Sequence, residues 1–239
     1  MKPKVPPQDF YDINQLPKEK GMILFGISMS NIAHTQSPQK CFEYIQYLCT
    51  KIKKTEGIGL TFIYSDYLYM ITDSSPAKKL RKKYIQQMRS HKYGILKLLE
   101  RDPAWIVPSF SFLSWGQLLL DFKDIQMYLD SIKKEYASNK KFKAAVKADM
   151  LKKRLTKEQV DFFLEEITIF YLLVKGKISL SNDYIHHHEK WVLNCYPGNP
   201  LECEKFLYRY NLLGLENKHN KFENHQYNLK RKHLINLSV

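Results

Sequence analysis

The order of apolar and amphipathic segments constrains the fold of this chain more than any other feature of its sequence. An apolar run at residues 22–27 is typical of a buried strand, and a second such run follows at residues 60–64. Between them, Ser37 and Pro38 suit the cap and the first position of a helix, and apolar residues then recur at helical spacing. A strand, a helix and a strand within about 45 residues predict a parallel crossover unit.

The same alternation continues along the chain. Further expected elements are a helix at 75–101, a strand at 105–112, helices at 125–153, at 156–174 and at 201–213, and a strand that begins at 191. This order predicts an α/β protein with a single Rossmann-like domain, in which helices cover both faces of a doubly wound, mainly parallel sheet. Within the 239 residues we expect an N-terminal arm at 1–20, the Rossmann-like catalytic domain at 21–214 and a basic, mobile tail at 215–239.

The sequence argues against a membrane or metal protein. No charged leader precedes an apolar run, and no apolar stretch approaches the ~18 residues that span a bilayer. The histidines at 186–188 are consecutive, and consecutive loop residues rarely converge on one ion. The 4 cysteines lack the close pairs of a zinc site: Cys41, Cys49, Cys195 and Cys203. We expect a cytoplasmic protein, a monomer, with no metal and no cofactor.

Positive charge is concentrated on the predicted helix at 75–101, and the predicted helix at 125–153 repeats the pattern. Lys and Arg number 38 against 24 Asp and Glu, a net charge of +14. A solvated helix face usually interleaves both signs, because like charges four residues apart repel, whereas the helix at 75–101 is almost purely basic. The residues concerned are Lys78, Lys79, Arg81, Lys82, Lys83, Arg89, Lys92 and Lys97. This pattern favours an anionic partner such as a nucleic acid over a plain solvated surface.

Three residues are candidates for chemistry at the carboxyl edge of the sheet. Ser28 ends the first predicted strand, where its hydroxyl projects into the ligand crevice of such folds as a candidate nucleophile. Gly26 points to the same face and leaves room for a substrate atom. Asp66 and Tyr196 end other strands and are expected near the same edge. A serine or tyrosine in such a place also suits a cap or a turn.

Glu166 is a further candidate, on a helix. Its predicted helix places it in one row with Phe162 and Phe170, at the border of the apolar stripe. A carboxyl between aromatic rings is partly desolvated, which raises its pKa unless a cation compensates. The same residue also suits a boundary glutamate that turns outward.

Taken together, these segments resemble the cyclodipeptide synthases from about residue 23 to residue 213. The similarity lies in three segments, Gly-Ile-Ser-Met-Ser-Asn at 26–31, Phe-Phe-Leu-Glu-Glu at 162–166 and Leu-Asn-Cys-Tyr-Pro at 193–197, with basic helices between them. The family's fold is similar to the catalytic domain of class I aminoacyl-tRNA synthetases. The resemblance implies an enzyme that joins two amino acids, taken from two aminoacyl-tRNAs, into a cyclic dipeptide.

The resemblance also implies residue roles. Ser28 takes the first aminoacyl group as an ester, Glu166 holds its ammonium group, and Tyr196 relays a proton during ring closure. The basic helix grips the first tRNA through its phosphates. Positions expected to contact the aminoacyl group are Leu24, Gly26, Asn31, Ile63 and Phe162. Leu24 and Ile63 hint at an apolar first residue.

Two positions depart from the family pattern. Phe162 stands where the family usually has a tyrosine, so one hydroxyl contact to the amine is missing. Pro197 is typical of the Tyr-Pro branch, whereas Asn31 looks more like the other branch. The alternatives are an inactive tRNA-binding protein of the same fold, a hydrolase of aminoacyl esters or mischarged tRNA, and a protein of the membrane surface.

Overall fold

The computed structural model describes residues 21–51, 58–72, 75–101, 109–150, 156–178, 191–216, 222 and 224–239. They form one six-stranded sheet in the order β3-β2-β1-β4-β5-β6. Its strands are β1 (Gly21–Ile27), β2 (Ile58–Tyr64), β3 (Ser109–Ser114), β4 (Trp191–Tyr196), β5 (His225–Asn228) and β6 (His233–Asn236). Neighbouring strands run parallel from β3 to β5, and only β6 is antiparallel to its neighbour.

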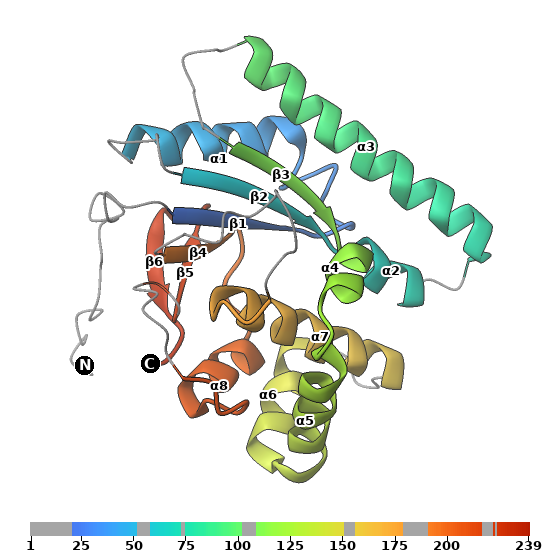
Figure 1. Cartoon of the computed structure of the whole chain (residues 1–239), viewed down its shortest axis with the longest axis vertical. Helices are drawn as coiled ribbons and strands as arrows, with labels where there is room; N and C mark the ends of the chain where they lie inside the picture. The colour runs from blue at the N-terminus through green and yellow to red at the C-terminus, as the bar shows by residue number, and fades with distance from the viewer. Residues whose placement is uncertain are drawn as a thin grey trace, which may run out of the picture.

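Helices cover both faces of the sheet (Figure 1). One face carries α1 (Pro38–Lys51) and α3 (Ala77–Arg101), which pack against each other. The other carries α4 (Trp115–Asp121), α5 (Ile125–Ser138), α6 (Lys140–Met150), α7 (Lys157–Val174) and α8 (Glu202–Tyr210). The short helix α2 (Asp66–Thr72) follows β2 directly. Each face therefore has its own apolar core, and the predicted Rossmann-like α/β fold is confirmed.

The central strand β1 explains this two-sided arrangement. Residues 22–25 are almost fully buried, because alternate side chains enter the two cores. Met22 and Leu24 pack towards α7, whereas Ile23 and Phe25 pack towards α1. A strand buried on both faces has a continuous apolar sequence, which is the signal seen at residues 22–27.

Two predicted elements need correction. The third strand lies at Ser109–Ser114, later than the expected 105–112, and residues 105–108 lie outside the described part. The expected helix at 125–153 is divided into α5 and α6 at Asn139. The Asn139 Oδ1 accepts the backbone N–H groups of Lys141 and Phe142, each at 3.1 Å, which starts a new helix.

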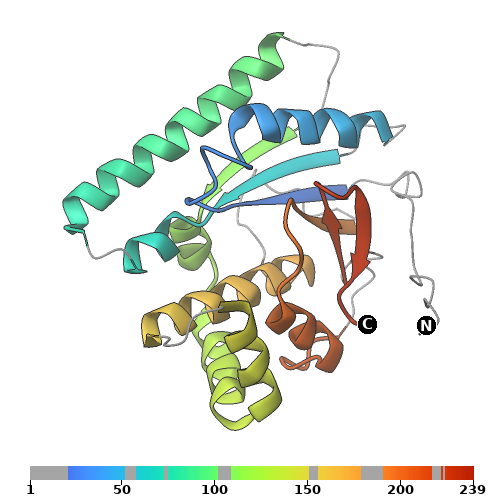
Figure 2. The same cartoon turned by 180° about the vertical axis from the view of Figure 1, so that it is seen from behind.

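The expectation of a mobile tail at 215–239 is wrong for the residues that the structure describes. β5 and β6 extend the sheet beyond β4, at the edge seen in Figure 2. Tyr227, Leu234 and Leu237 are buried there. These few large apolar side chains are enough to anchor a short hairpin, although the segment as a whole is polar and basic. The N-terminal arm at 1–20 lies outside the described residues.

The described helices do not suit a membrane span. None of them combines the length and the apolar composition that crossing a bilayer requires.

Candidate active site

A cavity of about 240 Å³ lies at the carboxyl ends of β1 and β4. Strand β2, which follows β1 in the chain, pairs with one edge of β1, whereas β4 pairs with the other edge of β1. Ligands of open α/β sheets bind at such a reversal of strand order, because the connecting segments diverge there. Ser28, Glu166 and Tyr196 all line this cavity, so the structure brings the candidate catalytic residues together.

The hydroxyl of Ser28 belongs to a small polar cluster. Its Oγ lies 2.6 Å from the phenol oxygen of Tyr69 and 2.9 Å from the Oγ of Ser30. The Ser30 hydroxyl also lies 3.0 Å from the Tyr69 phenol, which closes a triangle of hydrogen bonds. Tyr69 comes from α2, a helix that the sequence pattern did not predict. This cluster holds the serine hydroxyl at the cavity and gives its proton a neighbouring acceptor.

The backbone around Ser28 is clamped by Gln36. The Gln36 Oε1 accepts the Ser28 backbone N–H at 2.8 Å, and its Nε2 donates to the Gly26 carbonyl at 2.5 Å. Gln36 is itself buried, and its own carbonyl oxygen lies 2.8 Å from the His91 Nε2. The other ring nitrogen of His91 lies 2.9 Å from the Tyr64 hydroxyl. Burial lowers the pKa of His91 to about 4, so this histidine is a neutral structural residue.

Glu166 has a strongly shifted acidity. Burial raises the pKa of its carboxyl to about 7. Among the described residues that line the cavity, none is Lys, Arg or His, so no protein cation there compensates the carboxylate. A bound ammonium group offers that compensation.

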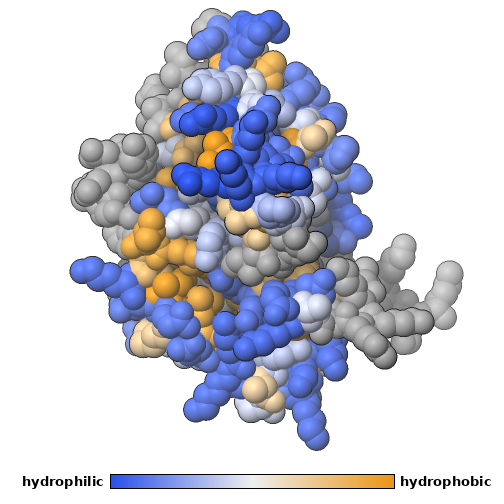
Figure 3. All heavy atoms as spheres, turned by 90° about the vertical axis from the view of Figure 1, so that its right-hand side faces the viewer, coloured by the Kyte–Doolittle hydropathy of each residue, from blue (hydrophilic) through white to orange (hydrophobic). Residues whose placement is uncertain are grey.

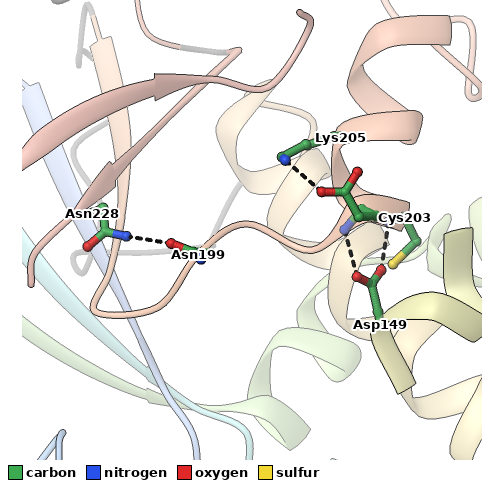
Figure 4. Close-up of polar contacts among 6 residues, drawn as sticks. Asp149, Asn199, Cys203, Lys205 and Asn228 are labelled. Atoms are coloured by element: carbon green, nitrogen blue, oxygen red, sulfur yellow. Dashed lines mark hydrogen bonds and ion pairs between the residues drawn. The ribbon is translucent and has the colours of Figure 1, made fainter. Parts of the chain in front are cut away.

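Tyr196 is held as a protonated phenol. Burial raises its pKa to about 12, and the nearby charges of Glu166, Tyr69 and Glu204 act in the same direction. Its ring packs on Gly198, where a Cβ atom would lie 2.6 Å from the Tyr196 Cε1. The loop after Tyr196 is fixed from β5, because the Asn228 Nδ2 donates to the Gly198 carbonyl at 2.9 Å. The same amide nitrogen donates to the Asn199 side chain at 3.3 Å (Figure 4).

The expected aminoacyl contacts divide into two groups. Gly26, Ile63 and Phe162 line the cavity, whereas Leu24 and Asn31 do not. Leu24 is only 1% exposed and belongs to the apolar core. The backbone of Asn31 shapes the loop after β1, since its N–H donates to the Ser28 carbonyl at 3.0 Å.

Two expectations at this edge are not met. The space above Gly26 does not stay open for a substrate atom, because a Cβ atom there would lie 2.8 Å from the Phe170 ring. Asp66 does not line the cavity, and its Oδ1 accepts the backbone N–H of Trp115 at 2.9 Å, at the start of α4.

Three cavity residues had no signal in the sequence. Tyr69 lies on α2, Glu204 on α8 and Gln226 on β5. Helix α8 is fixed by Asp149 of α6, whose carboxylate accepts the backbone N–H groups of Glu202 and Cys203 at 2.8 and 2.7 Å (Figure 4). These positions reach the cavity only through the order of the strands and the packing of α8, so no local pattern marks them.

The basic residues of α3 form a continuous exposed surface. The inner side of the helix is formed by four buried residues, Leu80, Tyr84, His91 and Ile95. All eight basic residues that the sequence predicts as an anion-binding face of this helix are exposed. His91 fills the gap in the apolar stripe. Hydrophilic side chains cover the part of the molecule where α3 lies in Figure 3. Lys79, Lys82 and Lys83 line a groove together with Ile32 and Ala33 of the loop after Ser28, so the positive surface reaches the active-site loop.

The described residues contain no group of three or more His, Cys, Asp or Glu side chains that are placed to hold a metal ion. The histidines at 186–188 lie outside the described part. The four cysteines are free thiols.

Comparison with known proteins defines the class of fold. No family model matches the chain, and no curated protein matches its sequence. Solved structures do match, among them cyclodipeptide synthases and class I aminoacyl-tRNA synthetases, which agrees with a synthetase-like Rossmann fold.

Three examples give the extent of the likeness. A cyclodipeptide synthase from Fluoribacter dumoffii has 15% identity and a TM-score of 0.55, with 83% of this chain and 86% of that chain covered. One from Staphylococcus haemolyticus has 15% identity and a TM-score of 0.55, with 89% and 94% covered. A tyrosyl-tRNA synthetase from Archaeoglobus fulgidus has 15% identity and a TM-score of 0.50, with 87% and 55% covered. At these identities the likeness shows the fold.

Proposed function

We propose that this protein is a tRNA-dependent cyclodipeptide synthase, which transfers two aminoacyl groups to one another through Ser28. One observation carries the proposal: Ser28, Glu166 and Tyr196 line the same cavity, and the basic surface of helix α3 lies beside it. The names of the structural neighbours from Fluoribacter and Staphylococcus agree with it.

In the first step, the Ser28 Oγ attacks the ester carbonyl of a first aminoacyl-tRNA. A new ester forms on Ser28, the bond to the tRNA ribose breaks, and the serine proton passes to the ribose hydroxyl. Tyr69, 2.6 Å from the Ser28 Oγ, lies on the path of this proton. An ester is already activated, so a serine without a His-Asp pair is adequate for this exchange. The step requires no cofactor, because the acyl group arrives in the form that the reaction consumes.

In the second step, the amine of a second aminoacyl-tRNA attacks the ester carbonyl on Ser28, so that an amide bond forms, the bond to the Ser28 Oγ breaks and the dipeptide remains esterified to the second tRNA. The Ser28 Oγ then takes this dipeptidyl group by a second ester exchange, which releases the second tRNA and gives a dipeptidyl-serine. The free amine of that dipeptidyl group then attacks its remaining ester carbonyl. Ring closure forms the second amide bond and releases a diketopiperazine. The protonated Tyr196 phenol acts at this stage as a hydrogen-bond donor and proton relay.

Glu166 holds the ammonium group of the first aminoacyl group. Its carboxylate lies in a cavity whose described lining has no basic side chain, and an ammonium partner favours the ionised form. The phosphates of the first tRNA lie along α3, on the residues from Lys78 to Lys97. Charged tRNAs are cytoplasmic molecules, so this function implies a cytoplasmic protein. We further propose that it acts as a monomer of the Tyr-Pro branch.

The test is expression of the protein and of its Ser28→Ala variant in a bacterium, followed by a search of both culture media for diketopiperazines by mass spectrometry. The proposal requires a cyclic dipeptide from the parent protein and none from the variant. Soluble parent protein without such a product would instead support an inactive tRNA-binding protein. Release of free amino acid from aminoacyl-tRNA by purified protein would support a hydrolase.

A further inference from the structure

The cavity lining is rich in hydrogen-bond acceptors. Besides Glu166, it includes the carboxylate of Glu204 and the side-chain amides of Asn194 and Gln226. Of these four residues, only Glu166 has a role in the proposed reaction. Glu204 and Gln226 come from elements, α8 and β5, that join the cavity only in the folded sheet.

Asn194 and Gln226 carry oxygen atoms that lack a partner. Asn194 is 6% exposed and Gln226 is 2% exposed. Within the described part of the chain, the Asn194 Oδ1 and the Gln226 Oε1 accept no hydrogen bond. A buried acceptor without a donor is costly, so such atoms in a cavity indicate a ligand that brings N–H or O–H groups.

Glu204 has acceptor capacity beyond its structural contact. It is the third residue of α8 and 8% exposed, and it accepts the backbone N–H of Leu201 at the cap of that helix. Asp149 already binds the next two N–H groups of the helix. A carboxylate offers about four lone-pair sites, so most of those of Glu204 remain for the cavity.

The charges in the cavity do not balance with one ammonium group. Glu166 and Glu204 lie close enough for the charge of Glu166 to disfavour ionisation of Glu204. None of the lining residues within the described ranges is basic. An α-ammonium group on Glu166 leaves Glu204 with the backbone N–H of Leu201 and the nearby charge of Lys205, which is not among the residues that line the cavity. It leaves the two amide oxygens without a donor.

We propose that the first aminoacyl group carries a basic side chain, such as that of lysine or arginine, whose terminal N–H groups bind Glu204, Asn194 and Gln226. The inference rests on the proposed function. A lysyl ammonium brings three donors and an arginyl guanidinium five, which match the acceptors present. The apolar walls, Ile63 and Ile167 among them, contact the aliphatic stem. An apolar side chain, as Leu24 and Ile63 alone suggest, leaves the acceptors unpaired.

The experiment measures covalent labelling of the purified full-length protein by single aminoacyl-tRNAs. Radiolabelled lysyl-, arginyl-, leucyl-, phenylalanyl- and alanyl-tRNA are each supplied, and Ser28→Ala is the blank. Faster labelling by lysyl- or arginyl-tRNA than by the apolar three is expected. Faster labelling by an apolar aminoacyl-tRNA overturns the inference and leaves the proposed function standing. Absence of labelling from every aminoacyl-tRNA overturns the proposed function, and the inference falls with it.

A variant of Glu204 then tests whether this residue causes the preference for basic aminoacyl groups. Glu204→Gln removes the charge, and a glutamine at this position of the helix still reaches the cap. It is expected to slow transfer of the basic group by about 10–100-fold and to change apolar transfer little. The matched control is Glu202→Gln on the same helix, which removes an exposed charge. Equal slowing with every aminoacyl-tRNA would mean that Glu204 only supports the fold.

A second variant guards against a loss of folding in the first. Gln226→Leu keeps a similar volume and removes a buried oxygen without a partner, so the fold is expected to tolerate it. Its preference is expected to shift towards apolar aminoacyl groups. An unchanged ratio of basic to apolar transfer in this folded variant would contradict the inference.

Discussion

The phenol oxygen of Tyr69 lies 2.6 Å from the Oγ of Ser28, although 41 residues separate the two in the sequence. The Tyr69 ring packs edge-on against Phe162, with ring centroids 5.4 Å apart. Phe162 is the position at which the resembling family usually has a tyrosine. A phenol hydroxyl is thus present beside Ser28, but it comes from α2 instead of α7.

Loss of this hydroxyl should slow acyl transfer to Ser28. We expect Tyr69→Phe to lower the rate constant by about tenfold, the value of one hydrogen bond at the reacting group. The measurement is rapid quenching of the protein with labelled aminoacyl-tRNA. Tyr67→Phe, on the same helix but exposed, is the control and should react like the parent protein. If Tyr69→Phe reacts at the rate of the parent protein, the Tyr69 hydroxyl takes no part in acyl transfer and only holds the loop after β1.

Gln36 should matter to both stability and activity. Gln36→Leu leaves the Ser28 N–H and the Gly26 carbonyl without their present partner, and each buried group left unpaired costs about 1–3 kcal/mol. We therefore expect the free energy of unfolding, measured with urea, to fall by about 2–4 kcal/mol. Gln86→Leu changes an exposed residue of α3 and serves as the reference. Equal unfolding curves for the two variants would argue against the clamp.

The elements with strong periodicity could be predicted from the sequence, and those without it could not. The continuous apolar runs of β1 and β2 and the capping box at Thr156 are local signals, and the structure has these elements. The break at Asn139 depends on one side chain that caps a helix within a stretch of helical pattern. The short helix α2, only 7 residues long, is too brief for periodicity to identify.

The candidate site was predictable in part for the same reason. Ser28 and Tyr196 end strands, and parallel strands bring such residues to one edge. Glu204 and Gln226 had no such signal, because their place depends on which strand follows β4 in the sheet. The hairpin after residue 224 was missed because its polar sequence resembles a disordered tail.

The C-terminal hairpin should contribute to stability as a core element does. Tyr227 is 2% exposed, and Tyr227→Ala is expected to lower the free energy of unfolding by about 3–5 kcal/mol, as loss of a large buried side chain does. Lys230→Ala, in the exposed turn of the same hairpin, should change it by less than about 0.5 kcal/mol. Denaturant unfolding of both variants decides the matter, since a mobile segment would give two equally small effects.

The basic surface of α3 should dominate tRNA affinity. We expect the double variant Arg81→Glu and Lys82→Glu to weaken tRNA binding and to reduce the slope of log K against log salt by about 0.7–0.9 for each phosphate that is no longer neutralised. Filter binding across a salt series measures both. A variant with Lys134→Glu changes an exposed charge on α5, on the opposite face of the sheet, and should affect the slope little. Similar effects per charge at both places would indicate a response to net charge alone.

The two cavity carboxyls should make stability depend on pH near neutrality. Burial raises the pKa of Glu166 from 4.5 to about 7, and that of Glu204 to about 7, where the charge of Glu166 contributes as well. Between about pH 4.5 and pH 7 the native state therefore binds more protons than the unfolded state, so the free energy of unfolding falls as pH rises through this range. The decline ends above the folded-state pKa.

Removing one of these carboxyls should flatten the decline. The measurement is the thermal unfolding midpoint of the ligand-free protein from pH 5 to pH 8. Between these pH values the midpoint of Glu166→Gln is expected to fall less than that of the parent protein. The carboxyl of Glu204 then ionises without the charge of Glu166 beside it, so its own pKa moves back towards the ordinary value. Glu202→Gln, exposed on α8, should follow the parent curve. Identical curves for all three proteins would mean that the cavity carboxyls are already solvated or paired, and both the ammonium site and the basic-side-chain pocket would lose their electrostatic support.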